Sequence, residues 1–132
     1  MDKLKGLETW HQFLETRNID GLKNLIADEA VLYSPVVFTP IKGKFMVSMY
    51  LTAAAKIIAN GYFKYIREVC DEENALLEFE TEISDVSVNG IDMIKFNEEG
   101  QLKEIKVMIR PLKAINIVHQ KMGEYLEKMK NS

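Results

Sequence analysis

The strongest constraint on the fold is the stretch at residues 76–110, where three segments alternate apolar and polar residues. In an extended chain, successive side chains point to opposite faces, so this alternation is typical of half-buried β-strands. Turn signals separate the segments, at Asp85-Val86 and at the run NEEG over 97–100. We therefore predict three antiparallel strands in a meander, over 75–84, 87–96 and 101–110.

Asp92 is the unusual residue of this meander, because it stands among aliphatic neighbours. A tight turn near 85–86 would pair Phe79 with Asp92 and Leu77 with Ile94, and cross-strand partners share a face of the sheet. Asp92 would then point to the apolar side, while the glutamates at 78, 80 and 82 would lie on the solvated outer side. A register error of one residue would reverse this orientation.

Helices are expected where apolar residues recur every three or four positions, at 3–17, 44–59 and 112–130. A short helix through Ala27, capped by Asp20, is expected before a strand at 30–34, and a further strand is expected at 62–70. This order predicts an α+β domain with its helices on one face of an antiparallel sheet. We expect a single domain over 1–132, in which a strongly curved sheet wraps around the N-terminal helices as a cone and encloses a pocket.

The expected pocket combines an apolar wall with two polar candidates, Asp92 and Tyr33. Asp92 would serve as a general acid or base, and the phenol of Tyr33 would donate a hydrogen bond to a ligand. The wall itself is expected from inward-facing strand positions and helical stripes, at Trp10, Leu14, Tyr50, Phe79, Val88, Ile94, Ile105, Val107 and Ile109. His11 and His119 are expected to pack at the edges of their helices, and Cys70 is expected to be buried on a strand.

Composition argues against several classes of function. Hydrophobic residues at 47% are enough for a core, while a net charge of -3 does not provide the basic face that nucleic-acid binding needs. No run reaches the roughly 20 apolar residues of a membrane span, and no leader is visible at the N-terminus. The sequence contains no Cys and His set at metal-ligand spacing and no phosphate-binding loop. We therefore expect a cytoplasmic protein that uses no metal and no cofactor and contacts neither membrane nor nucleic acid.

Two segments resemble a known family. The first, ADEAVLYSPVVFTPIKGKFMVSMYL, is similar to the strand, proline-rich loop, glycine and third helix of the nuclear transport factor 2-like superfamily. The second, VNGIDMIKFNEEGQLKEIKVMIRPL, resembles the meander of that superfamily. Together they extend the resemblance over nearly the whole chain. The superfamily includes SnoaL-like polyketide cyclases, ketosteroid isomerase and limonene epoxide hydrolase, so the resemblance implies the cystatin-like fold and leaves the function open.

The resemblance is carried over residue by residue. Tyr33 stands where the epoxide hydrolases hold a water molecule with a tyrosine. Their asparagine and their acid would fall on Pro35 and Val107, which cannot do this chemistry, so the resemblance implies that the hydrolytic triad is absent. Asp92, by its strand and by the face on which it lies, resembles the acids that other members use for proton transfer.

Three functions fit these residues. The first is a cofactor-free isomerase or cyclase, in which Asp92 moves a proton next to a carbonyl group and Tyr33 stabilises the enolate oxygen. The second is a binding protein that holds a small hydrophobic molecule in the same pocket without chemistry. The third is a dimeric scaffold. The family implies a homodimer through the outer face of the sheet, where the apolar residues are Ile91, Met93 and Met108.

Overall fold

The structure is a computed structural model that describes residues 3–130. Helices α1 (Lys3–Thr16) and α2 (Ile19–Leu25) lead into strand β1 (Ile26–Tyr33), and strand β2 (Ile41–Lys42) precedes helix α3 (Lys44–Ile58). The meander comprises β3 (Lys64–Cys70), β4 (Asn74–Ile83), β5 (Val86–Phe96) and β6 (Leu102–Arg110), and α4 (Leu112–Lys130) follows it. Residues 1–2 and 131–132, which the predicted domain also includes, lie outside the described residues.

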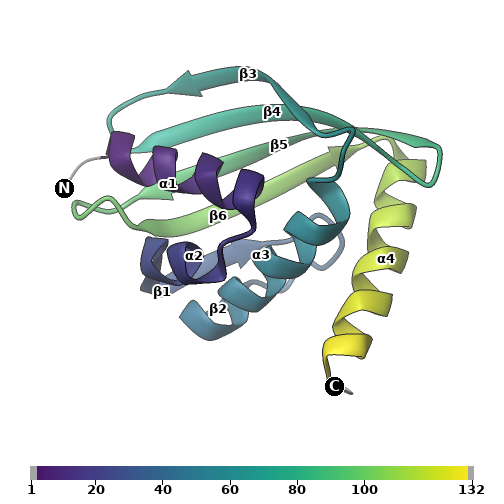
Figure 1. The fold of residues 1–132 in the computed structure, drawn as a ribbon, viewed down its shortest axis with the longest axis horizontal. Coiled ribbons are helices and arrows are strands. Elements are labelled where there is room, and N and C mark those ends of the chain that lie inside the picture. The colour runs from purple at the N-terminus through teal and green to yellow at the C-terminus, as the bar shows by residue number, and fades with distance from the viewer. Residues whose placement is uncertain (1–2, 131–132) are drawn as a thin grey trace.

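The strands form one six-stranded sheet in the order β2-β1-β6-β5-β4-β3. Neighbouring strands pair antiparallel, except that β1 pairs in parallel with β6. The sheet arches over α1, α2 and α3, and α4 stands at the end of β6, to the right in Figure 1. The predicted α+β class and its curved, cystatin-like cone are confirmed, and the parallel pair is the one departure from an all-antiparallel sheet.

The turn between β4 and β5 differs from the predicted one. Ser84 and Asp85 form it with positive φ angles of 49° and 68°, the backbone conformation that a two-residue hairpin turn needs. Asp92 therefore pairs with Leu77 and not with Phe79. The predicted pairing of the two strands is therefore wrong by two residues. Because side chains alternate between the faces with a period of two, Asp92 still faces inward.

Two local predictions are wrong. Asn18, and not Asp20, caps α2, because its side-chain oxygen accepts hydrogen bonds from the backbone N–H groups of Asp20 at 3.1 Å and Gly21 at 3.3 Å. Cys70 is exposed and not buried. The reason is that β3 is the edge strand of the sheet, and nearly all its residues face solvent.

The core lies between the concave face of the sheet and the helices, and it has two parts. One cluster joins α1, α2 and α3 to the sheet and includes Trp10, Leu22 and Ile94. The other joins the sheet to α4 and includes Phe79 and Val118. This division leaves room for a cavity between the clusters.

The outer face of the sheet carries the apolar residues that the family resemblance implies for a dimer. Met108 is 51% exposed, and Ile91 and Met93 are half-buried. A homodimer through this face stays a prediction. Within residues 3–130, no helix is both long enough and apolar enough to cross a membrane.

Candidate functional site

A cavity of about 250 Å³ lies between the two core clusters. Its walls come from α1, β1 and the loop that follows, α3, the inner face of the sheet, and α4. The wall is largely apolar, and Asp92 is the single carboxylate among the described residues that line it. Any molecule that binds here meets one acidic group in apolar surroundings.

Strand β5 places Asp92 in the wall, because alternate residues of this strand are buried on the concave face. The residue is only 7% exposed. Burial raises the pKa of its carboxyl group from the ordinary 3.8 to about 6, because apolar surroundings disfavour the charged form, and a hydrogen bond from Tyr65 lowers the pKa in part. That hydrogen bond occupies Oδ2, with the hydroxyl of Tyr65 donating at 2.6 Å. Oδ1 forms no hydrogen bond with residues 3–130, so it is available to a bound molecule.

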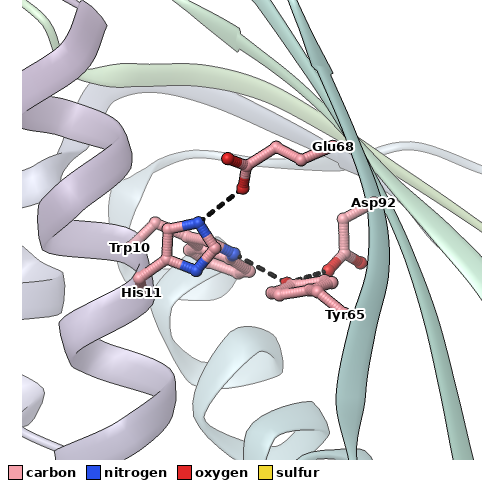
Figure 2. A network of polar contacts seen from close by, with 5 residues as sticks. All are labelled: Trp10, His11, Tyr65, Glu68 and Asp92. Carbon is pink, nitrogen blue, oxygen red and sulfur yellow. Dashed lines mark hydrogen bonds and ion pairs between the residues drawn. The ribbon is translucent and has the colours of Figure 1, made fainter.

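Tyr65 and Trp10 form a chain of donors that ends at Asp92. The indole N–H of Trp10 donates to the hydroxyl oxygen of Tyr65 at 2.9 Å, and the hydroxyl then donates to the carboxylate (Figure 2). Burial, followed by the negative charge of Asp92, raises the pKa of Tyr65 well above its usual value. The phenol therefore stays protonated through the neutral range and keeps donating to the acid.

Packing on both sides fixes the ring of Tyr65. His11 lies edge-on to it with ring centroids 5.4 Å apart, and Phe63 lies edge-on at 4.9 Å. His11 is held in turn by Glu68, whose Oε1 lies 2.7 Å from His11 Nε2 (Figure 2). This contact ties α1 to β3, so His11 is a polar tie between two elements and not merely a packed edge residue.

The cavity contains most, but not all, of the predicted wall. The predicted residues that line it are Asp92, Trp10, Leu14, Tyr50, Phe79, Ile105 and Val107. Val88 and Ile109 are instead packed in the cluster beside α4, and Ile94 is packed in the other cluster. These three residues lie on the predicted face of the sheet, but side chains of the core cover them.

Tyr33 does not take the place expected for it. Its neighbour Leu32 lines the cavity, and successive strand residues point to opposite faces, so Tyr33 points away. Its ring lies 5.1 Å from the Nζ atom of Lys106, a cation–π contact on the other side of the sheet. Tyr65 is the tyrosine that contacts Asp92.

Several residues of the site were missed by the sequence reasoning. These are Tyr65, Phe63, the loop residues 34–37, and the inner side of α4, including His119. The strand at 62–70 was expected, and the alternation of Phe63 and Tyr65 with Lys64 could have indicated that both aromatic rings face inward. His119 lines the cavity, and is not simply packed at the edge of its helix.

The chemistry open to this arrangement is proton transfer or hydrogen bonding at Asp92. Within residues 3–130, no group of three or more His, Cys, Asp or Glu side chains could hold a metal ion. A carboxyl group whose pKa lies near neutrality can accept a proton in one step and return it in the next.

Comparisons with protein-family models and with curated proteins give no match for the chain. Among solved structures, a steroid delta-isomerase from Pseudomonas aeruginosa is similar with a TM-score of 0.93 and 29% sequence identity, over 98% of this chain and 95% of that one. An uncharacterised bacterial protein with a cystatin-like fold from Silicibacter pomeroyi DSS-3 has a TM-score of 0.85 and 19% identity, over 92% and 85% of the two chains. An NTF2-like protein of unknown function from Mesorhizobium loti has a TM-score of 0.68 and 17% identity, over 83% and 93%.

These similarities agree with the order of elements and with the curved sheet. The two more distant structures support the fold alone, while the isomerase adds sequence similarity over nearly the full length of both chains. The predicted resemblance to the nuclear transport factor 2-like superfamily is confirmed, since the chain has the fold of these structures.

Proposed function

We propose that this protein binds a small apolar ketone in its cavity and moves a proton on that ketone, as an isomerase does, with Asp92 as the base that takes the proton and the acid that returns it. The observation that carries the proposal is the buried carboxyl group in an apolar cavity, with its pKa raised to about 6. A general acid–base group works best when its pKa lies near the working pH.

The hydrogen bonds around Asp92 support the role of a base. The two donors Tyr65 and Trp10 act in series on Oδ2, which stabilises the ionised form and holds the carboxylate in one orientation. Oδ1 is left for the proton of the substrate. The apolar wall excludes water, so a proton taken by the acid is returned to the substrate and not lost to solvent.

The oxygen of the ketone gains negative charge when the neighbouring proton leaves, so it needs a hydrogen-bond donor. Tyr33 cannot be this donor, because it faces away from the cavity. The lining residues offer the hydroxyl groups of Ser34 and Tyr50. The Ser34 oxygen accepts a hydrogen bond from the backbone N–H of Val36 at 3.1 Å, which leaves its own proton free to donate. We assign this role to Ser34 and Tyr50.

The similarity to a steroid delta-isomerase supports the same class of reaction. A delta-isomerisation relocates a double bond, and it requires one proton to be removed and one to be returned. A single acid between apolar walls is sufficient for both steps, and neither step needs a redox partner.

A second candidate is a binding protein without catalysis. The hydrogen bond from Tyr65 to Asp92 Oδ2 favours this candidate, because a carboxylate held in one orientation also binds a hydroxyl group of a ligand. In that case, replacement of the acid would change affinity, and no product would form.

The test uses a β,γ-unsaturated steroid ketone, whose conversion to the conjugated enone is followed by ultraviolet absorbance. Binding is measured separately by quenching of Trp10, the only tryptophan of the chain, which lines the cavity. We expect Asp92→Asn to lower kcat by about a hundredfold or more while binding changes little. The matched control is Glu80→Gln, which removes an exposed carboxylate from the outer face. We also expect kcat/KM of the unmodified protein to rise with pH through about 6, as the base ionises.

The possible results separate the candidates. Quenching without product formation at any pH would favour the binding protein. Turnover that survives Asp92→Asn would remove Asp92 from the mechanism. A rate that falls as pH rises through about 6 would mean that the protonated acid, and not the carboxylate, is the working form.

A further inference from the structure

A bulge in strand β3 places a second carboxylate on the concave face of the sheet. The register between β3 and β4 shifts between Tyr65 and Arg67, so Ile66 is an extra residue without a counterpart on β4. In a regular strand, Tyr65 and Glu68 would point to opposite faces, because they are three positions apart. The bulge changes this, and Glu68 pairs with Leu77, which is buried on the concave face.

The carboxylate of Glu68 lies in the same cross-strand row as that of Asp92. Glu68 pairs with Leu77, and Leu77 pairs with Asp92, so the row crosses β3, β4 and β5. The outer strands of this row are two strand spacings apart, roughly 10 Å. The side chain of Glu68 is 44% exposed, whereas Asp92 is 7% exposed. Asp92 lines the cavity, while Glu68 reaches α1 instead.

On α1, Glu68 contacts a residue that packs against the donor of Asp92. Its Oε1 atom lies 2.7 Å from His11 Nε2, and the ring of His11 lies edge-on to the ring of Tyr65 at 5.4 Å between centroids (Figure 2). The preceding residue of α1, Trp10, donates its indole N–H to the hydroxyl of Tyr65 at 2.9 Å. Two consecutive residues of α1 therefore hold Tyr65, one at its hydroxyl group and one at its ring.

Tyr65 needs this support because β3 is the edge strand of the sheet. It pairs with β4 alone, and nearly all its residues face solvent. Segments with few buried contacts open locally more easily than the core. The hydroxyl of Tyr65 donates to Asp92 at 2.6 Å, and a hydrogen bond weakens steeply when its distance or angle changes. A tie between α1 and the next part of β3 limits such a displacement.

We propose that Glu68 and His11 are positioning residues for the proton transfer at Asp92. Glu68 holds the imidazole of His11, and this ring holds the phenol of Tyr65 where its hydroxyl donates to the carboxylate. This role rests on the proposed function, because it takes Asp92 as the group that moves the proton. It adds two residues that lie outside the wall of the cavity, and the bulge of β3 is what turns Glu68 toward them.

The charge of Glu68 has to be separated from its contact with His11. Glu68→Gln removes the charge and keeps an oxygen that accepts a hydrogen bond from Nε2–H, whereas Glu68→Leu removes both. The difference between these two variants therefore isolates the contact. The other titratable side chains that line the cavity, or the hollow beside His11, stay unchanged in every variant, and they are Glu15, Arg17, Tyr50, Lys64 and His119.

The experiment measures the pKa of Asp92 in each variant by carboxyl-detected NMR, and kcat/KM for the β,γ-unsaturated steroid ketone over the same pH range. The hydrogen bond from Tyr65 lowers this pKa, so a weaker bond should raise it. We expect Glu68→Leu and His11→Leu each to raise it by about half a pH unit, which lowers kcat/KM about threefold at a pH below the pKa. Glu68→Gln should stay close to the unmodified protein. The double variant should shift no further than either single variant, because both residues act through one contact.

The matched control is Arg67→Leu. Arg67 precedes Glu68 on β3 and pairs with Glu78 at 3.4 Å on the outer face, so this variant removes an ion pair of the same strand and should leave the pKa of Asp92 unchanged. An equal shift in Arg67→Leu would overturn the inference, because it would mean that β3 loosens as a whole. An unchanged pKa in both Glu68→Leu and His11→Leu would overturn it as well.

These two results leave the proposed function intact. The proposed function fails instead if turnover survives Asp92→Asn, and the positioning role of Glu68 and His11 is then refuted with it.

Discussion

Replacement of Asp92 by asparagine should make the protein more stable at neutral pH. The pKa of Asp92 rises from 3.8 in its ordinary environment to about 6 when buried in the fold. At about 1.36 kcal/mol per pH unit, this difference corresponds to about 3 kcal/mol. The folded chain holds its proton more tightly than the unfolded chain, so stability is fully present below pH 3.8 and is lost as pH rises through about 6. Asparagine has the same shape and no charge, so it avoids this loss.

The measurement is urea unfolding at several pH values, followed by the fluorescence of Trp10, which is buried with 3% exposure, and by circular dichroism. The quantity of interest is the free energy of unfolding of Asp92→Asn minus that of the unmodified protein. This difference should grow by about 3 kcal/mol as pH rises from below 4 to 7, with most of the change between about pH 4 and pH 6.

Taking a difference between two proteins cancels the titration of every group that they share. The control Glu80→Gln removes an exposed carboxylate, and its difference should stay flat over the same range. Parallel curves for Asp92→Asn and the unmodified protein would refute the reasoning, because they would mean that the carboxyl group is solvated in the folded state. A carboxyl-detected NMR titration of Asp92 would then show a pKa near 3.8.

Two further predictions follow from the contacts of the site. Tyr65→Phe removes the hydrogen bond that lowers the pKa of Asp92, so NMR titration should show that pKa moving above about 6; a fall would contradict the assigned donor direction. Gly90→Ala would bring a Cβ atom within 2.5 Å of the ring of Phe79, so chemical denaturation should show a loss of about 1–3 kcal/mol and ligand affinity should fall. Gly21→Ala, whose nearest contact is 3.7 Å, is the matched control and should be neutral or stabilising.

The face of the sheet on which Asp92 lies could be predicted from the sequence, because it depends only on how side chains alternate between the two faces along a strand. Residues 75–96 alternate so regularly that a strand pairing displaced by two residues leaves every side chain on its predicted face. The same argument placed Ile94 on the inner face correctly. It could not decide whether Ile94 lines the cavity or is covered by other side chains of the core. That distinction depends on where the helices cover the sheet, and helix packing is not encoded in the alternation of one strand.

The two tyrosines show where the same reasoning stops. The strand that contains Tyr33 is a short apolar run without alternation, so its inner face could not be deduced, and Leu32 is the residue that points into the cavity. Tyr65 lies on an edge strand whose pairing with β4 shifts between Tyr65 and Arg67, a bulge that no local pattern indicates. Its partner Trp10 is 55 residues away in the sequence, and the contact exists only because the fold brings α1 against β3.

One residue of this cavity, Asp92, reduces the stability of the protein without improving its packing. Asp92 lowers stability by about 3 kcal/mol at neutral pH, although an asparagine would fill the same space. A residue that lowers stability and has a better-packed or neutral substitute is the mark of a functional position. Asp92 is also the single carboxylate among the described residues that line the cavity, so its charge stands where a bound molecule would meet it.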